Sequence, residues 1–175
     1  VPNGEKESLI PLIEKYNNLI VIRSLTKLIA IAGLRLGYAI SSSERLQQWQ
    51  ALRDPWPLNG LAIATGIILM KERDLLRDRI TQVHKWISSE GTWLHSNLQK
   101  LSGIIAHTSS TNFHLIESDH SLLKFREALA RKKILVRDCR SFVGLGENWL
   151  RIGLQNKADN QKILQAMKQS IRYIF

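Results

Sequence analysis

The chain has 175 residues, of which 44% are hydrophobic and 23% charged, and its formal net charge is +10 at pH 7. This composition excludes an intrinsically disordered chain, and the length suffices for one domain or slightly more with a buried core. The longest strongly apolar stretch, Leu61–Met70, is too short to span a bilayer, so we expect no membrane partner.

Basic residues are distributed along the chain rather than clustered. The densest run, Arg131–Lys133, is three residues long, and the five tryptophans do not interleave with basic residues on any one segment. An ordinary solvated surface therefore explains the net charge better than a nucleic-acid partner does. The first residues, Val1–Glu7, lack the basic and apolar regions of a signal peptide, and the single Cys139 cannot form an internal disulfide. Both observations favour a cytoplasmic protein.

Apolar patterning in the first 70 residues predicts part of a parallel α/β layer. Leu9–Tyr16 has the spacing of a short amphipathic helix, and the continuous apolar run Leu19–Ile22 is typical of a strand buried on both faces of a parallel sheet. Leu34–Ile40 alternates as a strand, with Arg35 on the face that carries small residues and leaves room for a ligand.

Two helices are predicted next, at Ser43–Arg53 and Asn59–Met70. In each of them the first residue has a side chain that favours the N-cap position. Pro55 and Pro57 lie between the two segments and force the break. Residues 1–70 therefore form one unit of the expected fold.

Residues 71–175 predict a separate small α+β domain. The longest helical pattern extends from Leu76 to Leu101, and Gly103 follows as its C-terminal stop. The pattern closes with a helix at Asn160–Ile174. The segments expected between are, in chain order, strands at Ile104–Ala106 and Asn112–Ile116, a helix at Leu122–Lys132, and strands at Ile134–Val136 and Leu150–Leu154.

Four polar residues around a turn carry the strongest chemical signal. Ser24, Thr26 and Lys27 follow the first predicted strand, and Arg35 lies a short distance further on. A lysine at the end of a buried strand, with hydroxyls beside it and a guanidinium nearby, suits a covalently held phosphorylated aldehyde. The amine would form an imine, and the other groups would bind the phosphate. On spacing alone, a solvated turn lysine and a sheet-edge ion pair of Arg35 fit at least as well.

Segment Ser24–Tyr38, which reads SLTKLIAIAGLRLGY, resembles the lysine segment of fold-type I pyridoxal-phosphate enzymes of the class I/II aminotransferase family. The resemblance implies that Lys27 forms the internal aldimine with pyridoxal 5'-phosphate. It also implies that Ser24, Thr26 and Arg35 hold the cofactor phosphate.

The second half of the chain supports the same resemblance. Ile134–Leu154, which reads ILVRDCRSFVGLGENWLRIGL, is similar to a segment of threonine-phosphate decarboxylases, which are relatives of the histidinol-phosphate aminotransferases. Pro55–Ala62 and Asn112–Phe113 resemble the same subgroup. The resemblance implies that Arg151 binds the substrate α-carboxylate, with Arg137 also close to the substrate.

The residues themselves leave two interpretations of Arg151 open. It lies beside Gly153 on the small-residue face of a predicted strand, where a guanidinium can clamp a carboxylate through two hydrogen bonds. The alternative is a structural ion pair with Asp138 or Glu147. Gln155 stands where relatives of the decarboxylase type often have another arginine, which departs from the subgroup's pattern.

The histidines and the single cysteine do not predict a further site. The five histidines show no metal-ligand spacing, and no histidine stands at a partner spacing to Cys139. We therefore predict neither a metal site nor a cysteine nucleophile.

The resemblance implies the fold-type I architecture. Residues 1–70 would be the C-terminal part of the large cofactor-binding domain, whose sheet is mostly parallel, and residues 71–175 the small C-terminal α+β domain. Family members are considerably longer, and they hold the cofactor partly with an aspartate, a glycine loop and an aromatic ring that precede the lysine strand. We therefore expect this chain to be a C-terminal half that is weakly active or inactive alone, with apolar surface exposed at Leu19–Ile22.

The implied function is that of an enzyme acting on a small phosphorylated amino acid. The expected reaction is decarboxylation of L-threonine O-3-phosphate to aminopropanol phosphate in cobalamin biosynthesis. The alternatives are a histidinol-phosphate-type aminotransferase and a catalytically incompetent truncated fragment. Family members commonly pair as homodimers, so we expect a homodimer for the full-length form.

Overall fold

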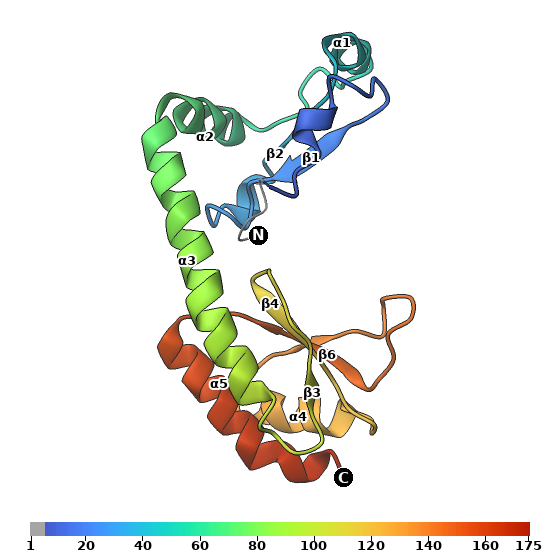
Figure 1. Ribbon diagram of the computed structural model, residues 1–175, viewed down its shortest axis with the longest axis vertical. Coiled ribbons are helices and arrows are strands. Elements are labelled where there is room, and N and C mark those ends of the chain that lie inside the picture. Colours follow the sequence, from blue (N-terminus) through green and yellow to red (C-terminus); the bar gives the residue numbers. More distant parts are fainter. Residues whose placement is uncertain (1–5) are drawn as a thin grey trace. The chain divides into compact units, whose positions relative to one another are not determined.

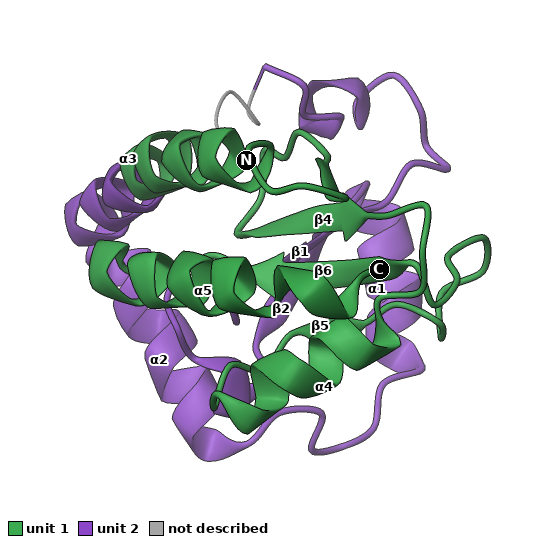
Figure 2. Cartoon of the chain, turned by 90° about the horizontal axis from the view of Figure 1, so that it is seen from below, with its two compact units in different colours: residues 1–2, 84–175 green, residues 3–83 purple. Residues whose placement is uncertain are grey.

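The computed structural model describes residues 6–175, and its contacts divide the chain into two compact units (Figures 1 and 2). One unit contains the described residues up to Val83, and the other contains His84–Phe175. This boundary falls inside the long helix α3 (Arg73–Leu98), whereas the domain division expected from the sequence, after residue 70, stays a prediction. Among the described residues, no helix has the length and apolar character needed to cross a membrane.

A two-stranded antiparallel ribbon organises the first unit (Figure 1). Strand β1 (Val21–Ser24) pairs with β2 (Gly37–Ile40), so that Ser24 lies opposite Gly37. The ladder continues one step further, because the Leu25 N–H donates to the Leu36 carbonyl at 3.1 Å. The two strands are therefore joined by a loop of residues 26–35 whose ends remain hydrogen-bonded.

The burial and pairing expected for Leu19–Ile22 are wrong within the described structure. β1 pairs antiparallel rather than parallel, and Ile22 is 76% exposed. An aliphatic run indicates that a segment favours a strand. Whether two strands pair parallel or antiparallel depends on the segment that connects them. A parallel neighbour needs a crossover, usually a helix, and the connection here contains only a turn and the short 3-10 helix η2 (Ala32–Leu34). The exposed apolar surface expected at this strand is present at Ile22.

The segment Leu9–Tyr16 does not form the expected α-helix. A single 3-10 turn, η1 (Ile10–Leu12), is followed by isolated turns. Only Ile13 of this segment is buried, and a helix this short needs burial of an apolar face to be stable.

Helices α1 (Ser43–Ala51) and α2 (Gly60–Lys71) form close to their predicted positions. The N-cap of α1 is Ser42, one residue earlier than expected, whose hydroxyl accepts from the Arg45 N–H at 3.4 Å. The N-cap of α2 is Asn59, as predicted, and its side-chain oxygen accepts from the Ala62 N–H at 2.9 Å. The small core of this unit is built on Leu25, Leu36 and Ala62.

The second unit is a four-stranded antiparallel sheet with helices, and its strand order is β3-β4-β6-β5. The sheet elements are β3 (Ile105–Ala106), β4 (Phe113–Glu117), β5 (Arg137–Asp138) and β6 (Trp149–Gly153). The helical elements are the C-terminal part of α3, α4 (Leu123–Arg131), α5 (Lys157–Ser170) and the 3-10 turn η3 (Ile171–Tyr173).

The two faces of this sheet differ in burial. His114, Ile116, Leu150 and Ile152 are buried, whereas the residues that alternate with them are partly exposed. Helix α3 packs on the buried side, since a Cβ added at Gly91 would lie 3.7 Å from the His114 ring. We call this side the inner face and the opposite side the outer face.

The prediction of a strand at Ile134–Val136 is wrong, because strand β5 begins one residue later, at Arg137. The N–H groups of Lys132, Lys133 and Ile134 bond back to carbonyls of α4, so these residues close the helix instead of joining the sheet. Helix α3 ends at Leu98, before the expected end at Leu101, and it runs without a break through Gly91.

Candidate functional site

Lys27 lies in the turn that directly follows β1. The Ile29 N–H donates to the Leu25 carbonyl at 3.2 Å and closes this turn, while the Leu25 side chain is buried beneath it. Lys27 itself is exposed, and no described residue forms a hydrogen bond or ion pair with its amine. The sequence therefore folds so that apolar neighbours anchor the turn and the amine remains available to a ligand.

Two hydroxyls lie beside each other where β1 ends and this turn begins. Ser24 Oγ and Thr26 Oγ1 are 2.9 Å apart, and the Thr26 N–H donates to Ser24 Oγ at 3.3 Å. Thr26 is only 8% exposed, so its hydroxyl is fixed by its surroundings as well as by this contact. A hydroxyl both donates and accepts, and each can therefore turn a proton towards an anionic ligand.

Arg35 is not on a strand, which corrects the prediction for Leu34–Ile40. It follows η2 with left-handed backbone angles (φ 56°, ψ 40°), and its Nη1 donates to the Ala32 carbonyl at 3.2 Å. A non-glycine residue with positive φ is uncommon and often marks a functional position. No carboxylate of the described residues forms an ion pair with Arg35, so the sheet-edge ion pair is not formed among them.

The β1–β2 ladder brings these four residues to one end of the ribbon. Leu25 bonds to Leu36, so the residues next to them in sequence, Thr26 and Arg35, leave the ladder at the same end. One amine, two hydroxyls and one guanidinium are thus gathered there from two segments. This end of the ribbon is the candidate site of the first unit.

Arg137 and Arg151 form a separate candidate group in the other compact unit. They are register partners on β5 and β6, and Leu115 of β4 lies opposite Arg151 on its other side. No carboxylate of the described residues lies within 4.0 Å of either guanidinium. Two cations are therefore held together on the outer face without a counter-ion from the described chain.

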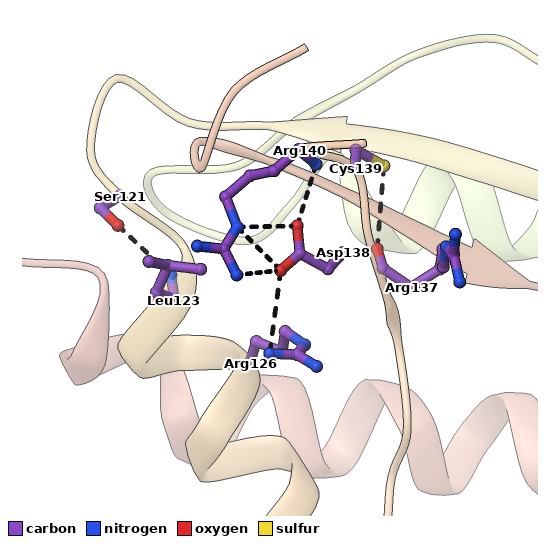
Figure 3. Close-up of polar contacts among 7 residues, drawn as sticks. All are labelled: Ser121, Leu123, Arg126, Arg137, Asp138, Cys139 and Arg140. Atoms are coloured by element: carbon purple, nitrogen blue, oxygen red, sulfur yellow. Dashed lines mark hydrogen bonds and ion pairs between the residues drawn. The ribbon is translucent and has the colours of Figure 1, made fainter. Parts of the chain in front are cut away.

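The alternative partner of Arg151, Asp138, is engaged elsewhere (Figure 3). Arg140 donates to both of its carboxylate oxygens, with Nη2 at 2.7 Å from Oδ2. Arg126 of α4 forms a longer ion pair with the same carboxylate, with 3.9 Å between Nη1 and Oδ2. The hydrogen bonds from Arg140 lower the pKa of Asp138 to about 2. Arg137 points away from this group in Figure 3, because successive residues of a strand project to opposite faces.

Cys139 lies between Asp138 and Arg140 in the sequence, and its side chain is fully buried. Its thiol donates to the Arg137 carbonyl at 3.7 Å, and burial raises the pKa of the thiol. A raised pKa disfavours the nucleophilic thiolate, which agrees with the expectation that this cysteine is not a nucleophile.

The contact between Phe113 and Arg151 is not predicted from the residues of the sequence alone. The ring of Phe113 lies under Arg151, with 4.9 Å between the guanidinium carbon and the ring centroid. Asn112–Phe113 was singled out only through the family resemblance. The signal that finds this contact is the β4–β6 register, which pairs Phe113 with Gly153. Strand registers cannot be read from one sequence.

Comparison with known proteins identifies the family of this chain. The family model described as "Aminotransferase class I and II" matches residues 2–167. The chain is 31% identical over 166 residues to histidinol-phosphate aminotransferase 2 of Archaeoglobus fulgidus, a match that covers 93% of this chain and 46% of that protein. It is 26% identical over 160 residues to the threonine-phosphate decarboxylase of Salmonella typhimurium, covering 91% of this chain and 43% of that protein.

The fold also has solved counterparts. The crystal structure of the histidinol-phosphate aminotransferase from Clostridium acetobutylicum superposes with a TM-score of 0.84 at 27% identity, covering 95% of this chain and 50% of that chain. The chain thus spans about half the length of the curated relatives that it matches.

Proposed function

Because this chain belongs to the aminotransferase class I and II family, we propose that it provides the cofactor-holding lysine and the substrate-binding arginines of a pyridoxal-phosphate-dependent enzyme. The observation that carries the proposal is the end of the β1–β2 ribbon, where the free amine of Lys27 is gathered with two hydroxyls and Arg35. The finer proposal is decarboxylation of L-threonine O-3-phosphate to aminopropanol phosphate. In this proposal the enzyme is a cytoplasmic homodimer, and its product serves cobalamin biosynthesis.

The residues at the end of the ribbon suit this cofactor. An exposed primary amine can condense with an aldehyde. The hydroxyls of Ser24 and Thr26 and the guanidinium of Arg35 are donors of the kind that bind a phosphate group. Arg35 has no carboxylate partner among the described residues, so its charge is available to an anionic ligand.

When bound, pyridoxal phosphate supplies an aldehyde for the lysine and a ring that withdraws electrons from the substrate Cα. The chain's own residues determine what happens at that carbon. Ser24, Thr26 and Arg35 would hold the phosphate by hydrogen bonds. Once the substrate amine has taken its place on the aldehyde carbon, Lys27 Nζ would take a proton from Cα or deliver one to it.

Arg151 selects the bond that reacts. Its guanidinium binds the α-carboxylate through two hydrogen bonds, and Arg137 adds a second positive charge beside it. By fixing the carboxylate, Arg151 would decide whether the Cα–carboxylate bond or the Cα–H bond of the substrate is the one that breaks. In the first case carbon dioxide would leave and Lys27 Nζ would support reprotonation of Cα. In the second case Lys27 Nζ would remove the proton, as transamination requires.

Transamination of the histidinol-phosphate type is the second candidate. Gln155 supports it, because relatives of the decarboxylase type often have an arginine there. Both reactions use Lys27, Arg151 and Arg137 in the same roles, so the residues of this site do not separate them.

Borohydride trapping tests the cofactor role. The chain is incubated with stoichiometric pyridoxal phosphate, reduced with borohydride and mapped by peptide mass spectrometry. We expect one phosphopyridoxyl label on Lys27, no label in Lys27→Ala, and an unchanged label in the surface control Lys85→Ala. A label spread evenly over the exposed lysines would contradict the proposal.

Substrate assays then separate the two reactions. Carbon dioxide released from L-threonine O-3-phosphate would indicate decarboxylation. Consumption of a keto acid with histidinol phosphate would indicate transamination. Labelling of Lys27 without either reaction would indicate a chain that holds the cofactor but cannot turn over by itself.

A further inference from the structure

The guanidinium of Arg151 rests against an aromatic ring. Its Cζ lies 4.9 Å from the ring centroid of Phe113, the first residue of β4. Phe113 pairs with Gly153, which lies two residues beyond Arg151 on β6 and on the same outer face. Diagonal neighbours of this kind contact each other across a sheet when their side chains are long or aromatic.

This ring contact matters because the guanidinium has no carboxylate to hold it. No described acidic residue lies within 4.0 Å of Arg151, and the nearby Asp138 is engaged on the other face by Arg140 and Arg126. An arginine side chain without a partner samples many rotamers and must be ordered again whenever a ligand binds. An aromatic ring attracts the cation and leaves its N–H groups free to donate.

The outer face beside Arg151 carries no side chain at Gly153. A Cβ built at Gly153 would meet only the side-chain amide of Gln155, at 3.5 Å. Phe113 therefore contacts the guanidinium from one side without filling the position next to it.

We propose that Phe113 is a positioning residue whose ring holds the Arg151 guanidinium in the orientation that receives the substrate carboxylate. The inference rests on the proposed function, in which Arg151 binds that carboxylate. Phe113 acts through Arg151 and needs no contact with the substrate.

The first test uses the ligand-free chain. The Nε–H group of Arg151 is followed by nitrogen-15 NMR relaxation in the wild type and in Phe113→Leu, which keeps an apolar side chain but removes the ring. We expect the order parameter to fall into the flexible range, below about 0.6, in Phe113→Leu, and to recover in Phe113→Trp. Phe142→Leu is the matched control, because Phe142 lies exposed in the loop between β5 and β6.

The second test measures anion binding. O-phospho-L-threonine is titrated into the chain at low ionic strength, and its Kd is measured by calorimetry. We expect Phe113→Leu to raise the Kd about 2- to 30-fold, the range that corresponds to a lost cation–π contact. Phe113→Trp should return the Kd to about the wild-type value, and Arg151→Gln should abolish saturable binding.

The variants distinguish a failure of the carboxylate role of Arg151 from a failure of the positioning role of Phe113. If Arg151→Gln binds O-phospho-L-threonine as well as the wild type does, the carboxylate role of Arg151 fails. If Arg151→Gln loses binding while Phe113→Leu keeps the wild-type Kd and order parameter, the positioning role fails and the proposed function stands. If the wild-type chain shows no binding, the order parameters of the Leu and Trp variants decide the positioning role alone.

Discussion

Arg137 and Arg151 stand opposite each other on β5 and β6, with both side chains on the outer face of the sheet. Like charges in register repel each other, and neither guanidinium has a carboxylate partner among the described residues. The alternation of the strand explains this, because Asp138 projects to the other face and is held by Arg140. The sheet therefore keeps two uncompensated cations at a position suited to an anionic substrate.

The first prediction concerns this repulsion. Arg137→Gln should raise the free energy of unfolding of the ligand-free chain by about 0.2–1 kcal/mol at low ionic strength, because a like-charge pair is removed. The gain should shrink in about 1 M salt, where the Debye length is about 3 Å. Urea denaturation at both salt concentrations measures it. Lys124→Gln, on the surface of α4, is the control, and an equal gain there would mean that only the net charge matters.

The second prediction concerns Asp138. Its pKa is lowered from 3.8 to about 2, so its stabilising contribution is present above pH 3.8 and is lost as the pH falls from 3.8 towards 2. Asp138→Asn should cost about 1 kcal/mol at neutral pH, the upper range for a partly exposed ion pair. The difference between wild type and variant should shrink as the pH falls through 2 and be absent by about pH 1 in a series of urea denaturations. A difference that persists at low pH would show that hydrogen bonding, not charge, is responsible.

Much of the fold could be predicted because local rules dominate it. Asn59 caps α2 as expected, and the alternation of Leu150 and Ile152 indicates β6. The fold-type I assignment came from the Ser24–Tyr38 segment and is confirmed by the structural match.

The errors have a common physical origin. Arg35 was placed on a strand because its neighbours alternate, but the preceding residues form a 3-10 turn and leave Arg35 in a left-handed conformation. The sequence predicts a strand at Ile134–Val136, but the N–H of Ile134 closes α4. In both cases a backbone hydrogen bond within a turn overrode the side-chain pattern.

The roles of Lys27 and Arg151 rest on motif resemblance and stay predictions. The structure adds the partners that each side chain has or lacks among the described residues. The ring of Phe113 and the separation of Asp138 from Arg151 both depend on strand register, which requires pairing information that a single sequence does not contain.

The third prediction concerns the apolar surface of α2. This helix exposes large side chains around its circumference, including Leu61 at 72%, Ile67 at 50% and Ile68 at 56%. The chain should therefore bind a dye such as anilinonaphthalene sulfonate in its native state. The double variant Ile67→Gln with Ile68→Gln should bind less dye and stay soluble at higher concentration, with a melting temperature close to that of the wild type. Undiminished dye fluorescence would place the exposed apolar surface elsewhere.

The fourth prediction concerns His114, which is buried on the inner face next to His95 of α3. The rings are stacked with 5.8 Å between centroids, and neither ring nitrogen of His114 has a hydrogen-bond partner. Burial lowers the pKa of His114 below 6.5; the backbone groups of His107 and Gly91 oppose this shift, and the charge of His95 adds to it. The native state therefore favours the neutral ring, and stability should be full above pH 6.5 and fall as the pH drops below it.

His114→Phe should remove most of this pH dependence, because it replaces an unpartnered polar ring with an apolar one of similar shape. Between pH 6.5 and 5 the wild type should lose up to about 1.4 kcal/mol of unfolding free energy per pH unit more than the variant, the limit for one proton. Chemical denaturation at several pH values measures both slopes. His120→Phe, at an exposed position, should leave the wild-type slope unchanged. Parallel slopes for wild type and His114→Phe would mean that another group takes up the proton, and His95, with its own unpartnered Nδ1, would be the next to replace.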